Sequence, residues 1–191
     1  ARLTDLRLAL LGRHQAANAA LATAATAELG RAGLEVSESA LRRGLAEVTW
    51  PARGEVLPRA PVVVLDAAHN VASAEALGQL LDESFAPRRR VLVFATTRDK
   101  DAAGILRVLL PRFDEVVFTR YAKNPRGVPP EELAALAAGL APVAHHECLH
   151  PAAAWQLAQS LTKADDLICI AGSIFIAAEM RALIGRAESR R

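Results

Sequence analysis

Side chains that could do chemistry come directly after three apolar runs of the sequence. In chain order they are Asp66, His69 and Asn70, then Lys100, and finally Ser173. Together they offer a carboxylate, an imidazole, an amide, an ammonium group and a hydroxyl. Groups of this kind bind the hydroxyls, phosphates and carboxylates of small polar ligands. The pattern therefore predicts a ligand site, provided that the fold brings the three segments together.

Each of these residues has a functional and a structural interpretation. Asp66 could accept hydrogen bonds from a ribose, and the helix start at His69 and Asn70 favours anions. Asp66 and Asn70 could instead cap that helix, and Ser173 could cap another. Lys100 is one of only three lysines among 23 basic residues, and its compact charge suits a carboxylate or phosphate. Taken alone, however, the Asp99-Lys100-Asp101 segment is more simply interpreted as a solvated charged turn.

Two further groups of side chains deserve the same comparison. Arg53 follows Trp50 and Pro51, where it could reach a phosphate in bidentate fashion or simply pack on the tryptophan as a surface arginine. Histidines and a cysteine gather at His145, His146, Cys148 and His150, but their spacing matches no common zinc framework. We expect a short strand and a polar loop there, and no metal site.

The elements that must position these residues alternate between strand and helix. Continuous apolar runs predict strands at Val62–Asp66, Arg90–Ala95, Glu115–Thr119 and Leu167–Ala171, with a short one near 142–146. Helical patterns lie at 72–83, 102–110, 130–140, 152–162 and 174–184, with Pro130 in a first helical turn. This order predicts a Rossmann-like, doubly wound α/β fold with a mostly parallel sheet of five or six strands. Ligands of such folds bind beyond the carboxyl ends of the strands.

The first fifty residues differ, because they read as helical throughout. One helix is expected over about 14–33, and Ser37 can cap a second over 38–48. Proline and glycine then turn the chain, and we place a boundary at 51–60. The expected division is a helical segment with a linker over 1–58 and the α/β domain over 59–191.

Composition excludes several classes of protein. An apolar fraction of 52% with 23% charged residues is typical of a globular chain, and 4% aromatics with a net charge of +2 argue against nucleic-acid binding. No run is long enough to span a membrane, and two cysteines favour reduced thiols in the cytoplasm. The sequence contains neither a GxxxxGK[ST] phosphate loop nor a GxGxxG fingerprint.

Five short motifs, in this order and spacing, resemble the folylpolyglutamate synthase/dihydrofolate synthase family of the Mur ligase superfamily. They are GRHQAANAA at 12–20, WPARGEVL at 50–57, DAAHN at 66–70, DKD at 99–101 and GS at 172–173. The similarity extends from about residue 8 to residue 182. Departures stand at Ala52, Gly54 and Val71, where the family usually has a glycine, an aromatic residue and a proline.

The resemblance implies that this chain is the C-terminal portion of a cytoplasmic, monomeric ligase that uses ATP and Mg²⁺. Residues 1–58 would end the central ATPase domain, and 59–191 would form the C-terminal domain. The phosphate-binding loop, the magnesium ligands and most of the pterin site would lie upstream, so the chain alone would be inactive. The reaction would join L-glutamate to dihydropteroate or a reduced folate through an acyl phosphate, releasing ADP and phosphate.

The resemblance also implies roles for individual residues. ATP would be held at the adenine by His14, Gln15 and Asn18, at the phosphates by Arg53 and at the ribose by Asp66. Glutamate would be held by His69, Asn70, Lys100 and Ser173. The catalytic residues would be His69, Arg53 and Lys100.

Two other functions remain open at this point. One is a Mur-type ligase that adds an amino acid to a peptidoglycan precursor. The other is a non-catalytic module that keeps a crevice for glutamate or nucleotide.

Overall fold

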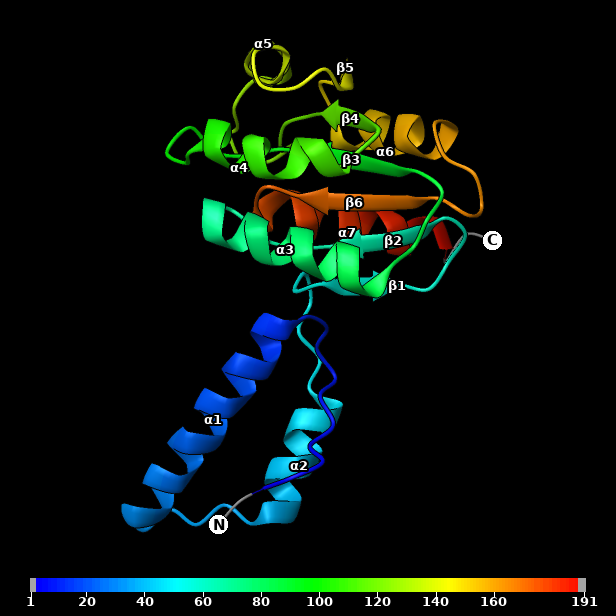
Figure 1. Cartoon of the computed structure of the whole chain (residues 1–191). Coiled ribbons are helices and arrows are strands. Elements are labelled where there is room, and N and C mark those ends of the chain that lie inside the picture. The colour runs from blue at the N-terminus through cyan, green and yellow to red at the C-terminus, as the bar shows by residue number, and fades with distance from the viewer. Residues whose placement is uncertain (1–2, 189–191) are drawn as a thin grey trace.

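The computed structural model describes residues 3–188 and forms a six-stranded sheet with helices on both faces (Figure 1). The spatial order of the strands is β1-β2-β6-β3-β4-β5. All pairs are parallel except β1 with β2. The strands are β1 (Glu55–Leu57), β2 (Val62–Leu65), β3 (Arg90–Phe94), β4 (Glu115–Phe118), β5 (Ala144–Glu147) and β6 (Leu167–Ala171).

Helices from successive crossovers cover the two faces of the sheet. The helices on one face are α3 (Val71–Ser84), α4 (Ala102–Leu109) and α5 (Pro130–Ala138), and a 3₁₀ turn, η1 (Leu110–Arg112), follows α4. Those on the other are α6 (Pro151–Ser160) and α7 (Ile174–Glu188). In Figure 1, α3 and α4 lie in front of the sheet and α6 and α7 behind it. Both faces of β2, β3, β4 and β6 are therefore buried, as their apolar composition requires, whereas the polar edge strand β5 is largely exposed.

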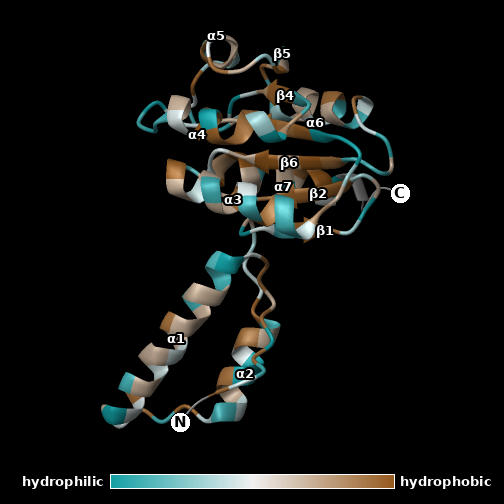
Figure 2. Cartoon of the chain, viewed as in Figure 1, coloured by the Kyte–Doolittle hydropathy of each residue, from teal (hydrophilic) through white to brown (hydrophobic). Residues whose placement is uncertain are grey.

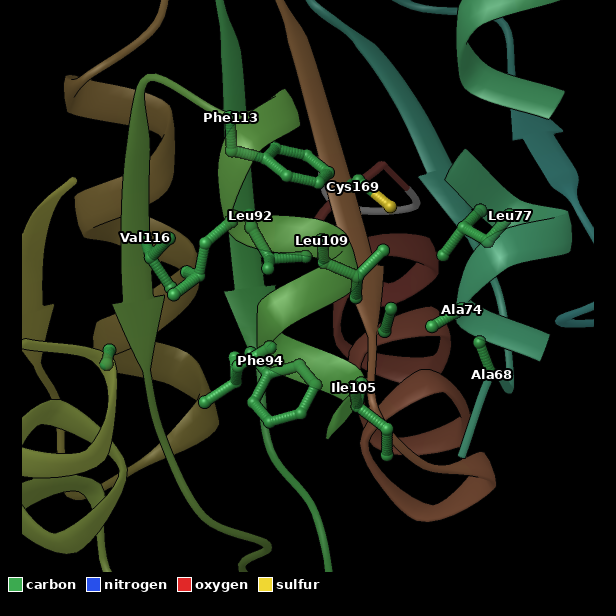
Figure 3. Packing of buried hydrophobic residues seen from close by; sticks show 14 of the residues in the cluster. Ala68, Ala74, Leu77, Leu92, Phe94, Ile105, Leu109, Phe113, Val116 and Cys169 are labelled. Atoms are coloured by element: carbon green, nitrogen blue, oxygen red, sulfur yellow. The ribbon is translucent and has the colours of Figure 1, made fainter. Parts of the chain in front are cut away.

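Alternate residues of each strand enter two different cores. On the α3/α4 side, Leu92 and Phe94 of β3 pack against Ile105 and Leu109 of α4 (Figure 3). On the α6/α7 side, Val91 and Val93 of the same strand meet the other core. This alternation fixes the register of the central strands, because a slip of one residue would exchange the two faces.

Two further helices, α1 (Arg13–Arg31) and α2 (Glu38–Glu47), extend away from the sheet (Figure 1). Apolar side chains of α1 remain in solvent, since Leu21 is 72% exposed and Leu29 44%. Figure 2 shows that apolar and polar segments alternate along this arm. Ser37 caps α2 by accepting a hydrogen bond from the Ala40 amide at 3.2 Å. The helical arm is thus well formed locally but has little core of its own.

The structure confirms the predicted fold class and the five predicted strands. The sheet has six strands because Glu55–Leu57 adds an antiparallel edge strand, β1, that the sequence pattern did not predict. Pro130 lies in the first turn of α5 as expected. Among residues 3–188, no helix is both long enough and apolar enough to cross a membrane.

Candidate functional site

The helices that follow neighbouring strands lie on opposite faces of the sheet around β6. The chain leaves β2 and β3 toward α3 and α4 on one face, whereas it leaves β6 toward α7 on the other. The turn after β6 is joined to the turn after β2, since the Gly172 amide donates to the Ala68 carbonyl at 3.0 Å. A crevice at such a switch point is the usual ligand site of doubly wound folds.

Gly172 makes the close approach of these turns possible. Its φ is +105°, and a Cβ at this position would lie 2.5 Å from the Ala95 carbonyl oxygen. Any side chain here would therefore push β6 away from the end of β3. The glycine sets where Ser173, the next residue, enters the crevice.

The segment after β2 presents His69 beside a capped helix. Asn70 Oδ1 accepts a hydrogen bond from the Ser73 amide at 2.8 Å, which completes a capping box at the start of α3. The Nδ1 atom of His69 lies 3.0 Å from the Ala67 carbonyl, to which it donates. Asn70 thus performs the structural role considered above, and the imidazole of His69 is exposed.

Lys100 lies in the loop after β3 and is paired within that loop. Its Nζ lies 3.0 Å from Asp99 Oδ2. Hydrogen bonds from Thr97 and Lys100 lower the pKa of Asp99 to about 2, so the aspartate is ionised at neutral pH. Asp101 caps α4 by accepting from the Gly104 amide at 2.8 Å. The ammonium group is thereby held at the helix start by an exposed partner that a ligand carboxylate could replace.

Ser173 is 5% exposed, and its Oγ accepts a hydrogen bond from the Phe175 amide at 3.1 Å. It therefore caps the start of α7, while its own hydroxyl hydrogen remains available. A buried residue that sequence reasoning missed, Tyr121, lies beside it and also senses the charge of Asp99. The available signal was its position two residues after the predicted third strand.

A second set of polar side chains lies at the start of α1. Gln15 is 4% exposed, and its Nε2 lies 2.9 Å from His14 Nε2, which must accept because an amide nitrogen only donates. Asn18 Nδ2 donates to Gln15 Oε1 at 3.0 Å. Burial, followed by the charge of Arg53, lowers the pKa of His14, while Asp66 acts in the opposite direction. The imidazole is therefore neutral, as its accepting role requires.

These side chains border a pocket of about 400 Å³ between α1, α2 and the linker. Its lining includes Gln15, Asn18, Trp50 and Arg53, and the rest is mostly aliphatic. A mostly apolar pocket whose lining also includes two amide side chains and a guanidinium group has the chemistry of a site for a heterocyclic base that carries an anionic group.

The Asp66 carboxylate joins this pocket to the edge of the sheet. Its Oδ2 accepts from the Gly54 amide and its Oδ1 from the Ala68 amide, both at 2.7 Å. Neither amide belongs to α3, so Asp66 fixes the linker and the strand-end turn rather than capping the helix. Burial raises the pKa of Asp66, although both hydrogen bonds and the nearby Arg53 lower it.

The predicted site residues thus fall into two groups. His14, Gln15, Asn18, Arg53 and Asp66 gather around the pocket and the linker. Asn70 and Ser173 cap helices that begin at the carboxyl edge of the sheet, and His69 and Lys100 lie in the loops beside those helix starts.

Other candidate sites lie apart from both groups. A larger hollow of about 710 Å³ opens beside α6 and α7 and is lined by Trp155, Glu179 and Leu183, among others. His146 hydrogen-bonds to Glu115 at 2.8 Å instead of joining a metal-ligand set. Within the part of the chain that the structure describes, no group of three or more His, Cys, Asp or Glu side chains could hold a metal ion.

The chain is similar to known proteins over most of its length. Residues 52–174 match the family model described as "Mur ligase, glutamate ligase domain". The dihydrofolate synthase/folylpolyglutamate synthase of Mycobacterium tuberculosis is 46% identical over 138 residues, which are 71% of this chain and 28% of that protein. The chain therefore spans well under half the length of this curated relative. The family resemblance predicted from the motifs is confirmed.

Solved structures agree over nearly the whole chain. The M. tuberculosis folylpolyglutamate synthase complexed with ADP matches 95% of this chain and 42% of its own, with a TM-score of 0.87 and 38% identity. E. coli FolC in complex with DHPP and ADP matches 97% of this chain and 42% of its own, with a TM-score of 0.84 and 31% identity.

Proposed function

This chain belongs to the Mur ligase family, and we propose that it is the C-terminal portion of an ATP-dependent ligase that joins L-glutamate to dihydropteroate or a folate. Residues 1–58 would close the central ATPase domain, and 59–191 would form the glutamate ligase domain. The observation that carries the proposal is the link through Asp66. Its carboxylate joins the linker, which adds Arg53 to the pocket lining, to the turn after β2, which carries His69.

The pocket beside α1 suits the adenine end of ATP. An amide that both donates and accepts can read the amino group and ring nitrogen of adenine, and Asn18 lies on the wall where it could do so. Arg53 would contact the phosphates and Asp66 the ribose through its remaining lone pairs. Relatives of known structure have been solved with ADP, which supports this assignment.

The strand-end group suits L-glutamate. Lys100 would exchange Asp99 for a substrate carboxylate, and Ser173 would donate its hydroxyl hydrogen to a carboxylate oxygen. His69 would face the reacting phosphate and the incoming amine, with Asn70 beside it. The Mg²⁺ ligands would belong to residues beyond this chain, together with the loop that cradles the triphosphate.

The chemistry follows from the poor reactivity of a carboxylate toward amines. Transfer of the γ-phosphoryl group of ATP to the acceptor carboxylate would create an acyl phosphate with a good leaving group and release ADP. The glutamate nitrogen would then form the amide bond as the C–O bond to phosphate breaks, and the amine would lose a proton. The chain's residues would contribute mainly position and charge stabilisation.

Phosphate release by the full-length protein tests the proposal. With ATP and L-glutamate present, dihydropteroate or a reduced folate should support release, whereas a UDP-muramoyl acceptor should not. The chain alone should bind ADP but release no phosphate, and the full-length protein should sediment as a monomer. Release with only the UDP-muramoyl acceptor would replace the folate assignment by a peptidoglycan ligase, and binding without any release would indicate a non-catalytic module.

A further inference from the structure

Tyr121 is the only tyrosine of the sequence, and its hydroxyl group is buried without a use that the fold explains. The residue is 4% exposed, and within residues 3–186 its Oη has no hydrogen-bond partner. A buried polar group without a partner costs about 1–3 kcal/mol. A fold that keeps such a group at the edge of a proposed site suggests that the partner comes into place when the site is filled.

The phenol ring is held firmly in place. It packs on the Phe175 ring with centroids 5.4 Å apart, and a Cβ at Gly127 would lie 3.1 Å from its edge. The following loop is fixed as well, because the Ala122 and Lys123 amides donate to the Glu179 carboxylate at 2.8 and 3.1 Å. Tyr121 is therefore prearranged rather than a mobile side chain.

The neighbours of the hydroxyl define what it can do. Burial raises the pKa of Tyr121 to about 12, with Asp99 and Glu179 adding to the rise and Ser173 and Arg126 opposing it, so the phenol is a neutral donor at pH 7. Ser173 lies close enough to act on it, although the two hydroxyls do not meet in hydrogen-bond geometry. The Ser173 oxygen accepts one hydrogen bond, from Phe175, and has a second lone pair.

We propose that Tyr121 is a positioning residue that acts through Ser173 when L-glutamate binds, an inference that rests on the proposed function. A small rotation of Ser173 lets its oxygen accept the Tyr121 O–H while it donates its own hydrogen to a glutamate carboxylate. The two hydroxyls then form a chain that ends on the substrate. Each donor in such a chain strengthens the next, so the carboxylate is bound more tightly than by Ser173 alone.

The test uses the full-length protein and the steady-state kinetics of phosphate release. Tyr121→Phe keeps the ring contacts with Phe175 and Gly127 and removes only the hydroxyl. We expect the KM for L-glutamate to rise about 10-fold, with kcat and the KM for ATP unchanged, which corresponds to the loss of one hydrogen bond. The melting temperature should not fall, because the free protein loses only an unpartnered group. Thr119→Val, which removes another buried hydroxyl without a partner among the described residues, should leave all three kinetic constants unchanged.

A double-mutant cycle shows whether Tyr121 acts through Ser173. In a Ser173→Ala background, Tyr121→Phe should cause no further rise in the KM for L-glutamate. An unchanged KM in the single variant, or an undiminished effect in the Ser173→Ala background, would overturn the role of Tyr121 while the ligase assignment stands. If the wild-type protein releases no phosphate with L-glutamate, both proposals fall together.

Discussion

At the scale of single residues, the Asp66 carboxylate joins the two halves of the proposed site. It accepts one amide from the linker, at Gly54, and one from the turn after β2, at Ala68. Arg53, one residue before Gly54, is placed by the same contact. The carboxylate is thus needed for the architecture whether or not it also contacts a ribose.

Asp66→Asn should lower the free energy of unfolding by about 1–3 kcal/mol, because an amide offers only one oxygen to two buried N–H donors. Urea titration of the 191-residue chain measures the change. Asp165→Asn makes the same chemical change at an exposed position and should leave the free energy unchanged. Equal stability of wild type and Asp66→Asn would show that these two hydrogen bonds do not hold the linker.

His14 should make the helical arm sensitive to pH. Burial and Arg53 lower its pKa from the ordinary value of 6.5, so the unfolded chain takes up this proton at a higher pH than the folded chain does. The contribution of neutral His14 to the free energy of unfolding is therefore fully present above pH 6.5 and is lost as the pH falls below that value.

His14→Gln removes the titration, so its free energy of unfolding should fall less than that of wild type when the pH is lowered from about 7.5 to about 5.5. Urea titrations at the two pH values give the comparison, and the four remaining histidines cancel in the difference. Identical losses in the two proteins would contradict the burial of a neutral His14.

At the scale of elements, the turn between β6 and α7 controls the crevice. Gly172→Ala should lower the free energy of unfolding by more than about 2 kcal/mol, since the new Cβ would meet the Ala95 carbonyl oxygen and the φ is unfavourable for alanine. Gly30→Ala, in α1 with open space around it, should instead raise stability by up to about 1 kcal/mol. Comparable melting temperatures for the two variants would argue against the tight turn.

Elements with a strong local pattern could be predicted from the sequence. The strand Val62–Leu65 is an uninterrupted apolar run, and Ser37 and Pro130 mark helix starts by their own chemistry. The edge strand Glu55–Leu57 could not be predicted, because three residues are too few to show a period and the strand is defined by its pairing with β2.

Some residues of the candidate site could be predicted from the sequence, and one could not. Asn70 and Ser173 followed from the rule that ligands meet the carboxyl ends of parallel strands. Tyr121 also follows a strand end, but the sequence does not show that its loop folds back and buries the hydroxyl. The position of this loop is fixed by Glu179, whose carboxylate accepts from the Ala122 amide 57 residues earlier in the chain.

At the scale of the whole molecule, the helical arm exposes apolar side chains that the sheet does not cover. Leu21 is 72% exposed, and Trp50 is 61% exposed beside the proposed nucleotide pocket. We propose that the remainder of a central ATPase domain covers this arm in the full-length protein. Closure of the two domains would then assemble the active site.

Leu21→Ser should affect stability differently in the 191-residue chain and in the full-length protein. In the 191-residue chain it should change the free energy of unfolding by less than about 0.5 kcal/mol, because the side chain is already in solvent. In the full-length protein it should cost about 2 kcal/mol or more, because a buried leucine would be replaced by a polar group. Differential scanning calorimetry of both proteins makes the comparison, and equally small effects would argue against a covering domain.

The most direct test of the central claim is the dependence of phosphate release on L-glutamate in the full-length protein, with dihydropteroate and ATP supplied. If this chain provides the glutamate side of a ligase site, wild type should release phosphate in proportion to ligated product. Lys100→Ala should then lose most of its kcat/KM for L-glutamate, while the matched Lys163→Ala, at an exposed lysine remote in sequence, should behave as wild type. Full activity in Lys100→Ala, or no glutamate-dependent release by wild type with any pteroate or folate acceptor, would contradict the account.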